Sequence, residues 1–364
     1  MPRPEDQTTT DTTSSRPHVS ARLEDRFNRR MARWLWARGW RTRIEPYAGY
    51  GAPGWVRVMA RTVLSPPQPD APAAPARAPQ DDPFQAVRGW RSLATAQVTD
   101  VAVDVHAGSQ VHRVTSDRGG YIDAVVEADL EPGWHDVELR IATGGVTARV
   151  FVVGPDVRAG LVSDIDDTIM VTSVPRPLLA VWNTFVLHEN ARRPVDGMAA
   201  LYKSLLEADP RAPVLYLSTG AWNAAPALDR FMQRHGYPAG ALLLTDWGPT
   251  NTGWFRSGAD HKRTSLRRLV EELPQIRWLL VGDDGQRDPE VYGELAAERP
   301  DRVRGVAIRR LTGTEQTLAH GVPTPPPQSQ GANRRTAAAG VPIVTGDDGA
   351  ALARELRAAG IDLS

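Results

Sequence analysis

Three carboxylates crowd together where one apolar stretch of the chain ends. Asp164, Asp166 and Asp167 lie at the end of the run 159–165, and Thr168 follows them. Aspartate and threonine often cap helices or turn the chain. Several acids in one place nevertheless repel one another unless a cation or a basic group offsets their charge. We therefore expect a functional site here.

A second apolar run, 214–218, ends in small polar residues. Ser218 closes the run, and Thr219 and Gly220 come next. Hydroxyl groups and backbone N–H groups of this kind suit the oxygens of a phosphate. The same residues are also ordinary turn formers, so this turn alone is weak support for a site.

A further acidic group follows the apolar run 278–282. It consists of Asp283, Asp284 and Asp288. Together with Asp164, these residues could supply the hard oxygen ligands that Mg²⁺ prefers. Lys262 stands at the start of the helical stretch before this run, where a lysine is often just a solvated surface charge.

The elements that position these groups follow from the pattern of apolar residues. Five uniformly apolar runs indicate parallel strands that are buried on both faces: 159–165, 214–218, 241–245, 278–282 and 303–308. Helical stretches lie between them: 196–208, 224–235, 262–273 and 289–299. This alternation predicts a doubly wound α/β domain over 158–312, whose strands bring their carboxyl ends to one edge.

The order of the motifs resembles the haloacid dehalogenase (HAD) superfamily of phosphotransferases. The shared features, over about 160–311, are Asp-x-Asp-x-Thr at 164–168, the hydroxyl-ended strand, Lys262 and Gly-Asp-Asp-x-x-x-Asp at 282–288. The segments SDIDDTI, HGYPxGxLLLxDWG and VGDDGQRDPEVY look like the catalytic domain of the actin-patch-associated phosphatidate phosphatase family. The chain departs from that family in its Ser-Thr-Gly-Ala-Trp turn at 218–222, where the family often has Ser-Asn-Ser-Pro-Trp.

The resemblance implies a reaction through an aspartyl-phosphate. Asp164 would attack phosphorus, and Asp166 would act as general acid and then as general base. Mg²⁺ would be held by Asp164, the backbone carbonyl of Asp166 and Asp283. Lys262 and Ser218 would hold the phosphate oxygens.

Further residues are expected around the substrate. Thr168 would fix the loop, and His261 would orient the loop beside Lys262. Asp284 and Asp288 are either outer ligands of the metal or partners of Lys262. We also expect substrate contacts from Thr219, Gly220 and Trp222, with Trp247 as a second aromatic flank of the pocket.

The substrate class follows from the spacing of the motifs. Neither insertion, between 168 and 214 or between 245 and 278, is long enough for a large cap domain, so we expect an open site for a bulky phosphomonoester. Phosphatidate is the leading candidate. A phosphatase of protein or nucleotide monoesters remains an alternative, as does an inactive module that binds a cation or a lipid.

Composition excludes some classes of protein. The chain of 364 residues has 43 Lys and Arg against 43 Asp and Glu, so it lacks the basic excess of general nucleic-acid binders, and we expect no nucleic acid partner. It contains no cysteine, which excludes disulfides and thiolate zinc sites. No stretch is typical of an export signal or a membrane span, so we expect a cytoplasmic protein.

The remaining sequence divides by composition. We expect a disordered lead (1–17), a basic amphipathic helix (18–43), a small β-sandwich-like domain (44–157) with a Pro/Ala loop (65–83), a low-complexity linker (313–340) and a C-terminal strand and helix (341–364).

The helical segment carries an apolar face opposite many arginines. This face consists of Leu23, Phe27, Met31, Trp34 and Leu35. Most amphipathic helices pack such a face on their own protein. A basic helix with aromatic residues can instead lie on an anionic membrane. The apolar stretch 177–187 is a second candidate for lipid contact, as a shallow lid.

Overall fold

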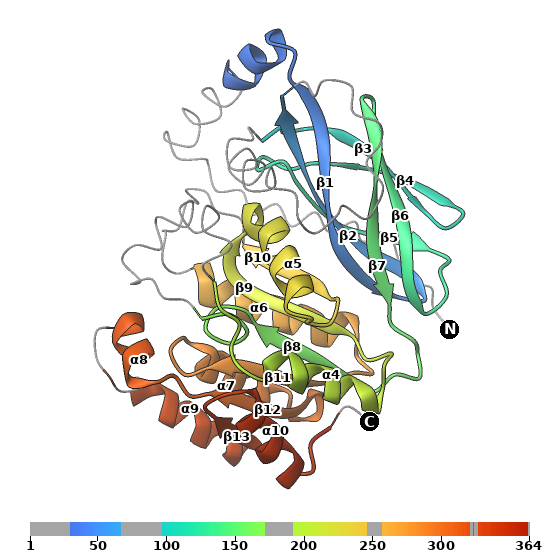
Figure 1. The fold of residues 1–364 in the computed structure, drawn as a ribbon. Coiled ribbons are helices and arrows are strands. Elements are labelled where there is room, and N and C mark those ends of the chain that lie inside the picture. Colours follow the sequence, from blue (N-terminus) through green and yellow to red (C-terminus); the bar gives the residue numbers. More distant parts are fainter. Residues whose placement is uncertain are drawn as a thin grey trace.

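The computed structural model describes residues 30–66, 97–171, 192–245, 257–320, 323 and 327–362. These residues form a mixed α/β structure with two sheets. One sheet has seven strands and the other has six. The seven-stranded sheet lies beside the α/β part, against helix α5 (Ala225–Arg234) and strand β10 (Ala241–Thr245) (Figure 1).

The β-rich part is built from hairpins, as the alternating pattern predicts. Its strands are β1 (Arg41–Ala52), β2 (Gly54–Ser65), β3 (Ala102–Ala107), β4 (Gln110–Thr115), β5 (Tyr121–Ala128), β6 (Gly133–Ile141) and β7 (Gly144–Val152). They follow the order β4-β3-β6-β7-β1-β2-β5. The pairing of β1 with β7 is parallel, and the other pairings are antiparallel.

This arrangement corrects the expected sandwich. The strands form one sheet that curls around its own core, where Val103, Leu139 and Val150 are fully buried. The ends of the sheet nearly meet, because His112 on β4 lies 2.8 Å from the carbonyl of Glu127 on β5. Alternation along a strand specifies which face is buried, but a curled sheet and a sandwich bury the same face.

The N-terminal helix is described from residue 30 to residue 37. Ala32 and Leu35 are buried against the β-rich core, so this part of the helix packs on its own protein. Trp34, which the sequence placed on the apolar face, is instead 49% exposed, and the guanidinium of Arg38 lies 3.4 Å from its ring centre. Residues 41–43, expected in the helix, begin β1. The segments 1–17 and 177–187, and most of 65–83, lie outside the described residues.

The second sheet is parallel and buried, which confirms the prediction from the apolar runs. Its strands are β8 (Ala159–Asp164), β9 (Val214–Ala221), β10, β11 (Arg277–Asp283), β12 (Val303–Arg309) and β13 (Ile343–Gly346). They follow the order β10-β9-β8-β11-β12-β13. Every residue of β8 and β10 is buried. Such strands need helices on both faces of the sheet.

The crossover helices match the predicted stretches within a few residues, apart from an earlier start of α6. Besides α5, they are α4 (Met198–Ala208), α6 (Ser257–Glu272) and α7 (Asp288–Glu298). The chain moves across the sheet in one direction from β8 to β10 and in the other from β11 to β12. Right-handed crossovers then place α4 and α5 on the face opposite α6 and α7.

No helix among the described residues is long and apolar enough to span a bilayer.

The expected linker 313–340 contains two helices. They are α8 (Gly313–His320) and α9 (Pro327–Ala338), and α9 packs against α7. The contact is close, because a Cβ atom at Gly293 would lie 3.1 Å from the Ala332 carbonyl oxygen. The small residues that made 313–340 look like a linker therefore allow the backbones of α7 and α9 to approach closely.

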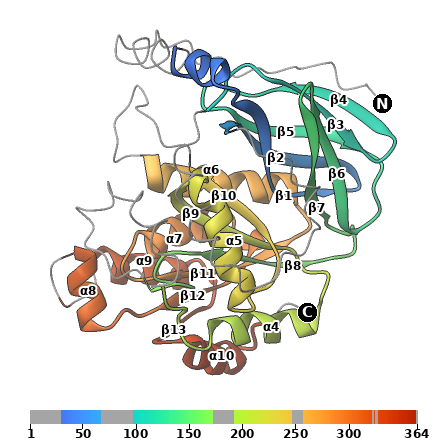
Figure 2. The same ribbon diagram turned by 45° about the horizontal axis from the view of Figure 1, so that its top comes forward.

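The C-terminal segment forms the predicted strand and helix. β13 extends the parallel sheet beside β12, and α10 (Gly349–Ala358) lies next to α4 (Figure 2). The N–H of Gly349 donates to the carbonyl of Asp196 at 2.9 Å. A Cβ atom at Gly349 would lie 2.2 Å from the Gly197 carbonyl carbon, so only glycine fits at this contact.

Gly349→Ala should therefore lower the free energy of unfolding by about 1–3 kcal/mol, because the added methyl group has no space beside a backbone. Gly331→Ala in α9 is the matched control. Nothing lies within 4 Å of a Cβ atom there, so alanine should stabilise the helix by up to about 1 kcal/mol. Thermal unfolding measures both changes. Equal melting temperatures for the two variants would contradict this account of the contact.

Candidate active site

The polar residues predicted from the sequence meet at one edge of the parallel sheet. β8 ends at Asp164 and the adjacent strand β11 ends at Asp283, while β9, on the other side of β8, carries Ser218. The chain reverses its direction across the sheet at β8. Ligands of open α/β sheets bind at this kind of switch point, beyond the carboxyl ends of the strands.

Three buried carboxylates form the centre of the site. Asp164, Asp283 and Asp288 each place an oxygen within 4.8 Å of the others. Burial raises the pKa of Asp164 well above its usual range, and the charges of Asp288 and Asp166 add to the effect, while Lys262 opposes it. Burial also raises the pKa of Asp283, again with help from Asp288 and Asp164. Such a cluster favours a bound cation.

Lys262 supplies one positive charge to this cluster. Its Nζ atom donates to Asp164 Oδ1 at 2.6 Å and also to Asp288 Oδ1. Burial alone would lower the pKa of Lys262, but Asp164 and Asp288 raise it above its usual value. The ammonium group therefore remains charged. Asp288 therefore pairs with Lys262, one of the two roles predicted for it, and it also belongs to the carboxylate cluster.

Asp284 has a different role from Asp288. Its Oδ1 atom accepts hydrogen bonds from the backbone N–H of Leu311 at 2.9 Å and from Gln316 Nε2 at 2.7 Å. These contacts tie β11 to the segment that enters α8. These contacts do not include Lys262, one of the two partners predicted for Asp284.

Asp166 and Ser218 form a second pair beside the cluster. Ser218 Oγ donates to Asp166 Oδ2 at 2.9 Å, and Asp166 Oδ1 is buried without a hydrogen-bond partner among the described residues. Burial raises the pKa of Asp166, although the Ser218 hydrogen bond lowers it. A raised pKa makes the protonated form, which a general acid requires, more accessible than in a solvated aspartate.

The loop after Asp164 is held by several contacts. Thr168 Oγ1 lies 3.3 Å from Asp164 Oδ2 and 3.5 Å from Asp283 Oδ2, in the loop that it is predicted to fix. Asp167 adopts a positive φ of 59°, which is uncommon for a residue other than glycine. Thr168 thus connects the end of β8 to the end of β11.

Two residues that hold this loop were not predicted. Gln286 Nε2 donates to the backbone carbonyl of Asp166 at 3.2 Å. Arg309, at the end of β12, donates from Nη1 to the carbonyl of Asp167 at 2.8 Å and pairs with Glu315. Arg309 could have been found from the sequence, since it follows the apolar run 303–308 as the other site residues follow theirs.

The turn after β9 is tied to its own neighbours. Gly220 N–H donates to Ser218 Oγ at 2.9 Å, and Thr245 Oγ1 donates to the carbonyl of Thr219 at 2.9 Å. Trp222 begins the short 3₁₀ helix η3 (Trp222–Ala224), and its ring stacks on Tyr47 of β1 with centroids 4.6 Å apart. Trp222 is thus 92% buried beside the β-rich part, although the sequence indicated a pocket-flanking role. Trp247 lies outside the described residues.

The β-rich part also contacts the helix that carries Lys262. Near the far end of α6, Glu272 accepts a hydrogen bond from Tyr50 at 2.7 Å and pairs with Arg57. Arg268 of the same helix pairs with Asp123 at 3.1 Å. These contacts hold α6 against β1, β2 and β5, at a distance from the carboxylates.

The residues present fit a divalent cation. The donors are carboxylate oxygens, and Lys262 balances only one of the three charges of Asp164, Asp283 and Asp288. Hard oxygen ligands of this kind suit Mg²⁺. The predicted set consisted of Asp164, Asp283 and the backbone carbonyl of Asp166, and the cluster contains the first two together with Asp288. The side chain of Asp166 faces Ser218, and its backbone carbonyl accepts a hydrogen bond from Gln286.

The α/β part of the chain is similar to known proteins. Residues 159–310 match the family described as "Phosphatidate phosphatase APP1, catalytic domain". Over 150 residues the chain is 27% identical to an uncharacterised protein of Schizosaccharomyces pombe, and over 151 residues it is 26% identical to phosphatidate phosphatase APP1 of Saccharomyces cerevisiae. Each match covers 41% of this chain, but only 24% and 25% of the yeast proteins, so the chain spans about a quarter of their length.

Solved structures add no argument about function. A carbohydrate acetylesterase of Xanthomonas citri is 11% identical, and the match covers 80% of this chain and 72% of the esterase. Its TM-score of 0.27 is too low to indicate a common fold.

His261 provides a test of how closely α6 packs. Its ring Nε2 lies 3.3 Å from the Leu243 carbonyl oxygen, and burial lowers its pKa to about 4. The unfolded chain regains a pKa near 6.5. Between these two values the unfolded state binds the proton and the folded state does not. The free energy of unfolding should therefore decrease as the pH is lowered from 6.5 to 4, by up to ~3 kcal/mol. His261→Gln should remove this loss, measured as the change in unfolding free energy between pH 7 and pH 4.5.

The difference in pH dependence between wild type and His261→Gln reports on His261 alone. Asp164 and Asp283, whose pKa values are raised, give contributions of the opposite sign that both proteins share. His106→Gln on β3 controls for the loss of a histidine elsewhere. An unchanged pH dependence in His261→Gln would show that the imidazole is not held neutral.

Proposed function

We propose that this chain, whose residues 159–310 form a catalytic domain of the phosphatidate phosphatase APP1 type, hydrolyses phosphomonoesters through an aspartyl-phosphate. The observation that carries the proposal is the contact between the buried Asp164 and Lys262 at 2.6 Å, with the Asp166–Ser218 pair beside it. A nucleophile (Asp164), a general acid (Asp166) and a positive charge for the phosphate (Lys262) thus lie together at the carboxyl ends of the parallel strands. The strand order β10-β9-β8-β11-β12-β13 supports a HAD-like doubly wound fold.

The first half of the reaction uses Asp164 and Asp166. A carboxylate oxygen of Asp164 attacks phosphorus, and the bond from phosphorus to the leaving oxygen breaks. Protonated Asp166 gives its proton to that oxygen, so the alcohol leaves uncharged. Lys262 neutralises part of the charge on the phosphate oxygens. The products of this half are the alcohol and the phosphorylated Asp164.

The second half releases phosphate. Asp166, now a carboxylate, takes a proton from water, and the water oxygen attacks phosphorus. The bond from phosphorus to Asp164 breaks, which restores both carboxyl groups to their starting states. Ser218, already bonded to Asp166, is placed to orient it in both halves.

A Mg²⁺ ion would be held by Asp164 and Asp283, with Asp288 nearby and the Asp166 carbonyl as the ligand that the family resemblance implies. When bound, it would offset the charge of the carboxylates and of the phosphate oxygens. Asp288 also keeps Lys262 in place. Its replacement would therefore affect both the cation and the ammonium group.

The proposed substrate is phosphatidate or a related lipid phosphate. The family match and the yeast phosphatidate phosphatase support this class. Contact with an anionic membrane is a further proposal, supported by Trp34 and Trp36, which are 49% and 45% exposed beside Arg33. Aromatic and basic side chains of this kind favour the bilayer interface.

Asp164→Asn tests the nucleophile. The amide has nearly the shape of the carboxylate but cannot attack phosphorus, so phosphate release from phosphatidate vesicles should fall at least about 10³-fold while the fold persists. Asp156→Asn, at an exposed acid, should retain activity. Near-wild-type turnover in Asp164→Asn would refute the mechanism. Faster release from a phosphoserine peptide or a nucleotide would instead reassign the substrate.

The metal requirement is tested by titration. Phosphate release should require added Mg²⁺ and stop in a chelator. Asp283→Ala removes a charged oxygen and should weaken apparent Mg²⁺ affinity by about tenfold or more. Asp284→Asn keeps an oxygen acceptor for Leu311 and should leave that affinity unchanged. Full activity in a chelator would exclude a role for the cation.

A further inference from the structure

Strand β9 is irregular at the point where it carries Ser218. Its parallel pairing with β10 is regular up to Leu217 and resumes only at Ala221, so residues 218–220 form a bulge. Bulges beside active sites commonly re-aim a side chain. Here Ser218 Oγ donates to Asp166 Oδ2 at 2.9 Å. The bulge 218–220 therefore sets the contact between these two side chains.

Contacts of side chains hold the bulge 218–220 where regular strand pairing is interrupted. Gly220 N–H donates to Ser218 Oγ at 2.9 Å, and the same oxygen donates to Asp166. On the other side, Thr245 Oγ1 lies 2.9 Å from the carbonyl oxygen of Thr219 and 3.2 Å from that of Gly220. The direction of the Ser218 hydroxyl group thus depends on where the backbone of the bulge lies.

The chain after the bulge lacks the usual helix caps. The short helix η3 and then α5 follow directly, and alanine stands at both of their N-cap positions, Ala221 and Ala224. An alanine side chain cannot accept a hydrogen bond from the first turn of a helix. The far end of the bulge must therefore be held by packing, and Trp222, the first residue of η3, is its buried side chain.

The β-rich part supplies that packing. The ring of Tyr47 on β1 stacks on Trp222, with centroids 4.6 Å apart and an angle of 22° between the planes. The Tyr47 hydroxyl group also donates to the Trp222 carbonyl at 3.4 Å. Tyr121 of β5 adds a third ring, 6.4 Å from Trp222. Aromatic contacts of this kind stabilise more than their buried area alone.

The shape of β1 brings Tyr47 to this position. Tyr47 and Tyr50 are an odd number of positions apart, so in a regular strand they would point to opposite faces. The register between β1 and β2 shifts between these two residues. Both tyrosines therefore face the α/β part, Tyr47 on Trp222 and Tyr50 on Glu272.

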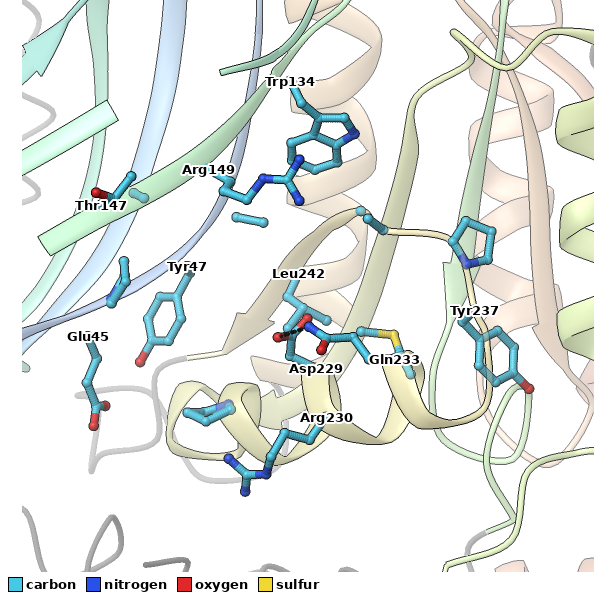
Figure 3. Close-up of a pocket in the computed structure, with 18 of the residues that line it drawn as sticks. Glu45, Tyr47, Trp134, Thr147, Arg149, Asp229, Arg230, Gln233, Tyr237 and Leu242 are labelled. Atoms are coloured by element: carbon cyan, nitrogen blue, oxygen red, sulfur yellow. Dashed lines mark hydrogen bonds between the residues drawn. The ribbon is translucent and has the colours of Figure 1, made fainter. Parts of the chain in front are cut away.

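Tyr47 also lies at the wall of a cavity of about 640 Å³ between the β-rich sheet and α5. Figure 3 shows its side chain extending from β1 toward the α/β part. Because its ring lies on Trp222, a smaller residue at position 47 would extend this cavity toward the indole. Trp222 would then lose its support and could shift, together with the end of the bulge 218–220.

We propose that Tyr47 is a positioning residue for Asp166, acting through Trp222 and the bulge 218–220. The inference rests on the proposed function, in which Asp166 protonates the leaving oxygen. Ser218 fixes Asp166 Oδ2, while Asp166 Oδ1 is buried without a hydrogen-bond partner among the described residues. The β-rich part, which lies outside the matched segment 159–310, thereby takes part in catalysis.

Two substrates with different leaving groups test this role. A general acid matters most where the leaving oxygen is basic, as in dihexanoyl phosphatidate, and least in para-nitrophenyl phosphate. Tyr47→Leu should lower kcat for dihexanoyl phosphatidate about tenfold or more, and for para-nitrophenyl phosphate less than about threefold. Tyr47→Phe keeps the stacked ring and should restore most of the turnover. Equal losses on both substrates in Tyr47→Leu would overturn the proposal.

A matched control separates positioning from a general loss of stability. Leu139→Val removes a methylene group from the interior of the β-rich sheet and should lower the melting temperature. It should leave the ratio of the two kcat values as in wild type. Trp222→Phe reduces the same stack from its other side and should shift the ratio as Tyr47→Leu does. A shifted ratio in Leu139→Val, or an unshifted one in Trp222→Phe, would refute the assignment.

A double-mutant cycle tests the path through Ser218. The losses of Tyr47→Leu and Ser218→Ala on dihexanoyl phosphatidate should combine to less than their product, because both act on one contact. Losses that multiply would exclude this path. A crystal structure of Tyr47→Leu supplies a measurement without turnover, in which Ser218 Oγ should have left Asp166. An unchanged contact would overturn the proposal.

Asp166→Asn distinguishes this inference from the proposed function. It should lower turnover of dihexanoyl phosphatidate more than that of para-nitrophenyl phosphate, because it removes the general acid. Equal losses in Asp166→Asn would overturn the proposed role of Asp166 and this inference with it. If Asp166→Asn distinguishes the substrates and Tyr47→Leu does not, only the inference about Tyr47 fails.

Discussion

The buried charge cluster around Lys262 is the constraint on which the α/β part depends. One ammonium group contacts Asp164 and Asp288, and Asp283 lies within the same cluster. An unpaired charge in this position would cost several kcal/mol, and so would loss of one partner from the pair. The start of α6 must therefore stay beside the carboxyl ends of β8 and β11. A carboxylate can stay ionised at a buried edge of a sheet only with such a partner.

The β-rich part helps to hold α6 and β9 in place, although its contacts lie away from the carboxylates. It contacts the far end of α6 through Glu272 and Arg268, and it contacts the turn after β9 through the stack of Tyr47 on Trp222. Lys262 and Ser218 reach the site from these two elements. The curled sheet thus contacts both elements, and a cavity beside α5 lies where the same two parts meet.

Helix α8 also contacts residues around the site. Glu315 and Gln316, both beyond the matched segment 159–310, hold Arg309 and Asp284. Arg309 in turn holds the carbonyl of Asp167 in the loop that follows Asp164. The matched catalytic segment is therefore completed, in this chain, by contacts from outside its limits.

The sequence by itself determined the parallel sheet and most of the site, because uniformly apolar runs specify buried strands and parallel strands bring their ends together. Asp164, Ser218 and Asp283 follow from that rule, whereas Lys262 lies on a helix and was indicated by the family resemblance. Tertiary structure decided what depends on partners far apart in the chain: Asp288 meets Lys262, whereas Asp284 faces α8. It also decided that the hairpins curl into one sheet and that Trp222 is buried against it. Periodicity specifies which face of a strand is buried, but only long-range packing selects the neighbour.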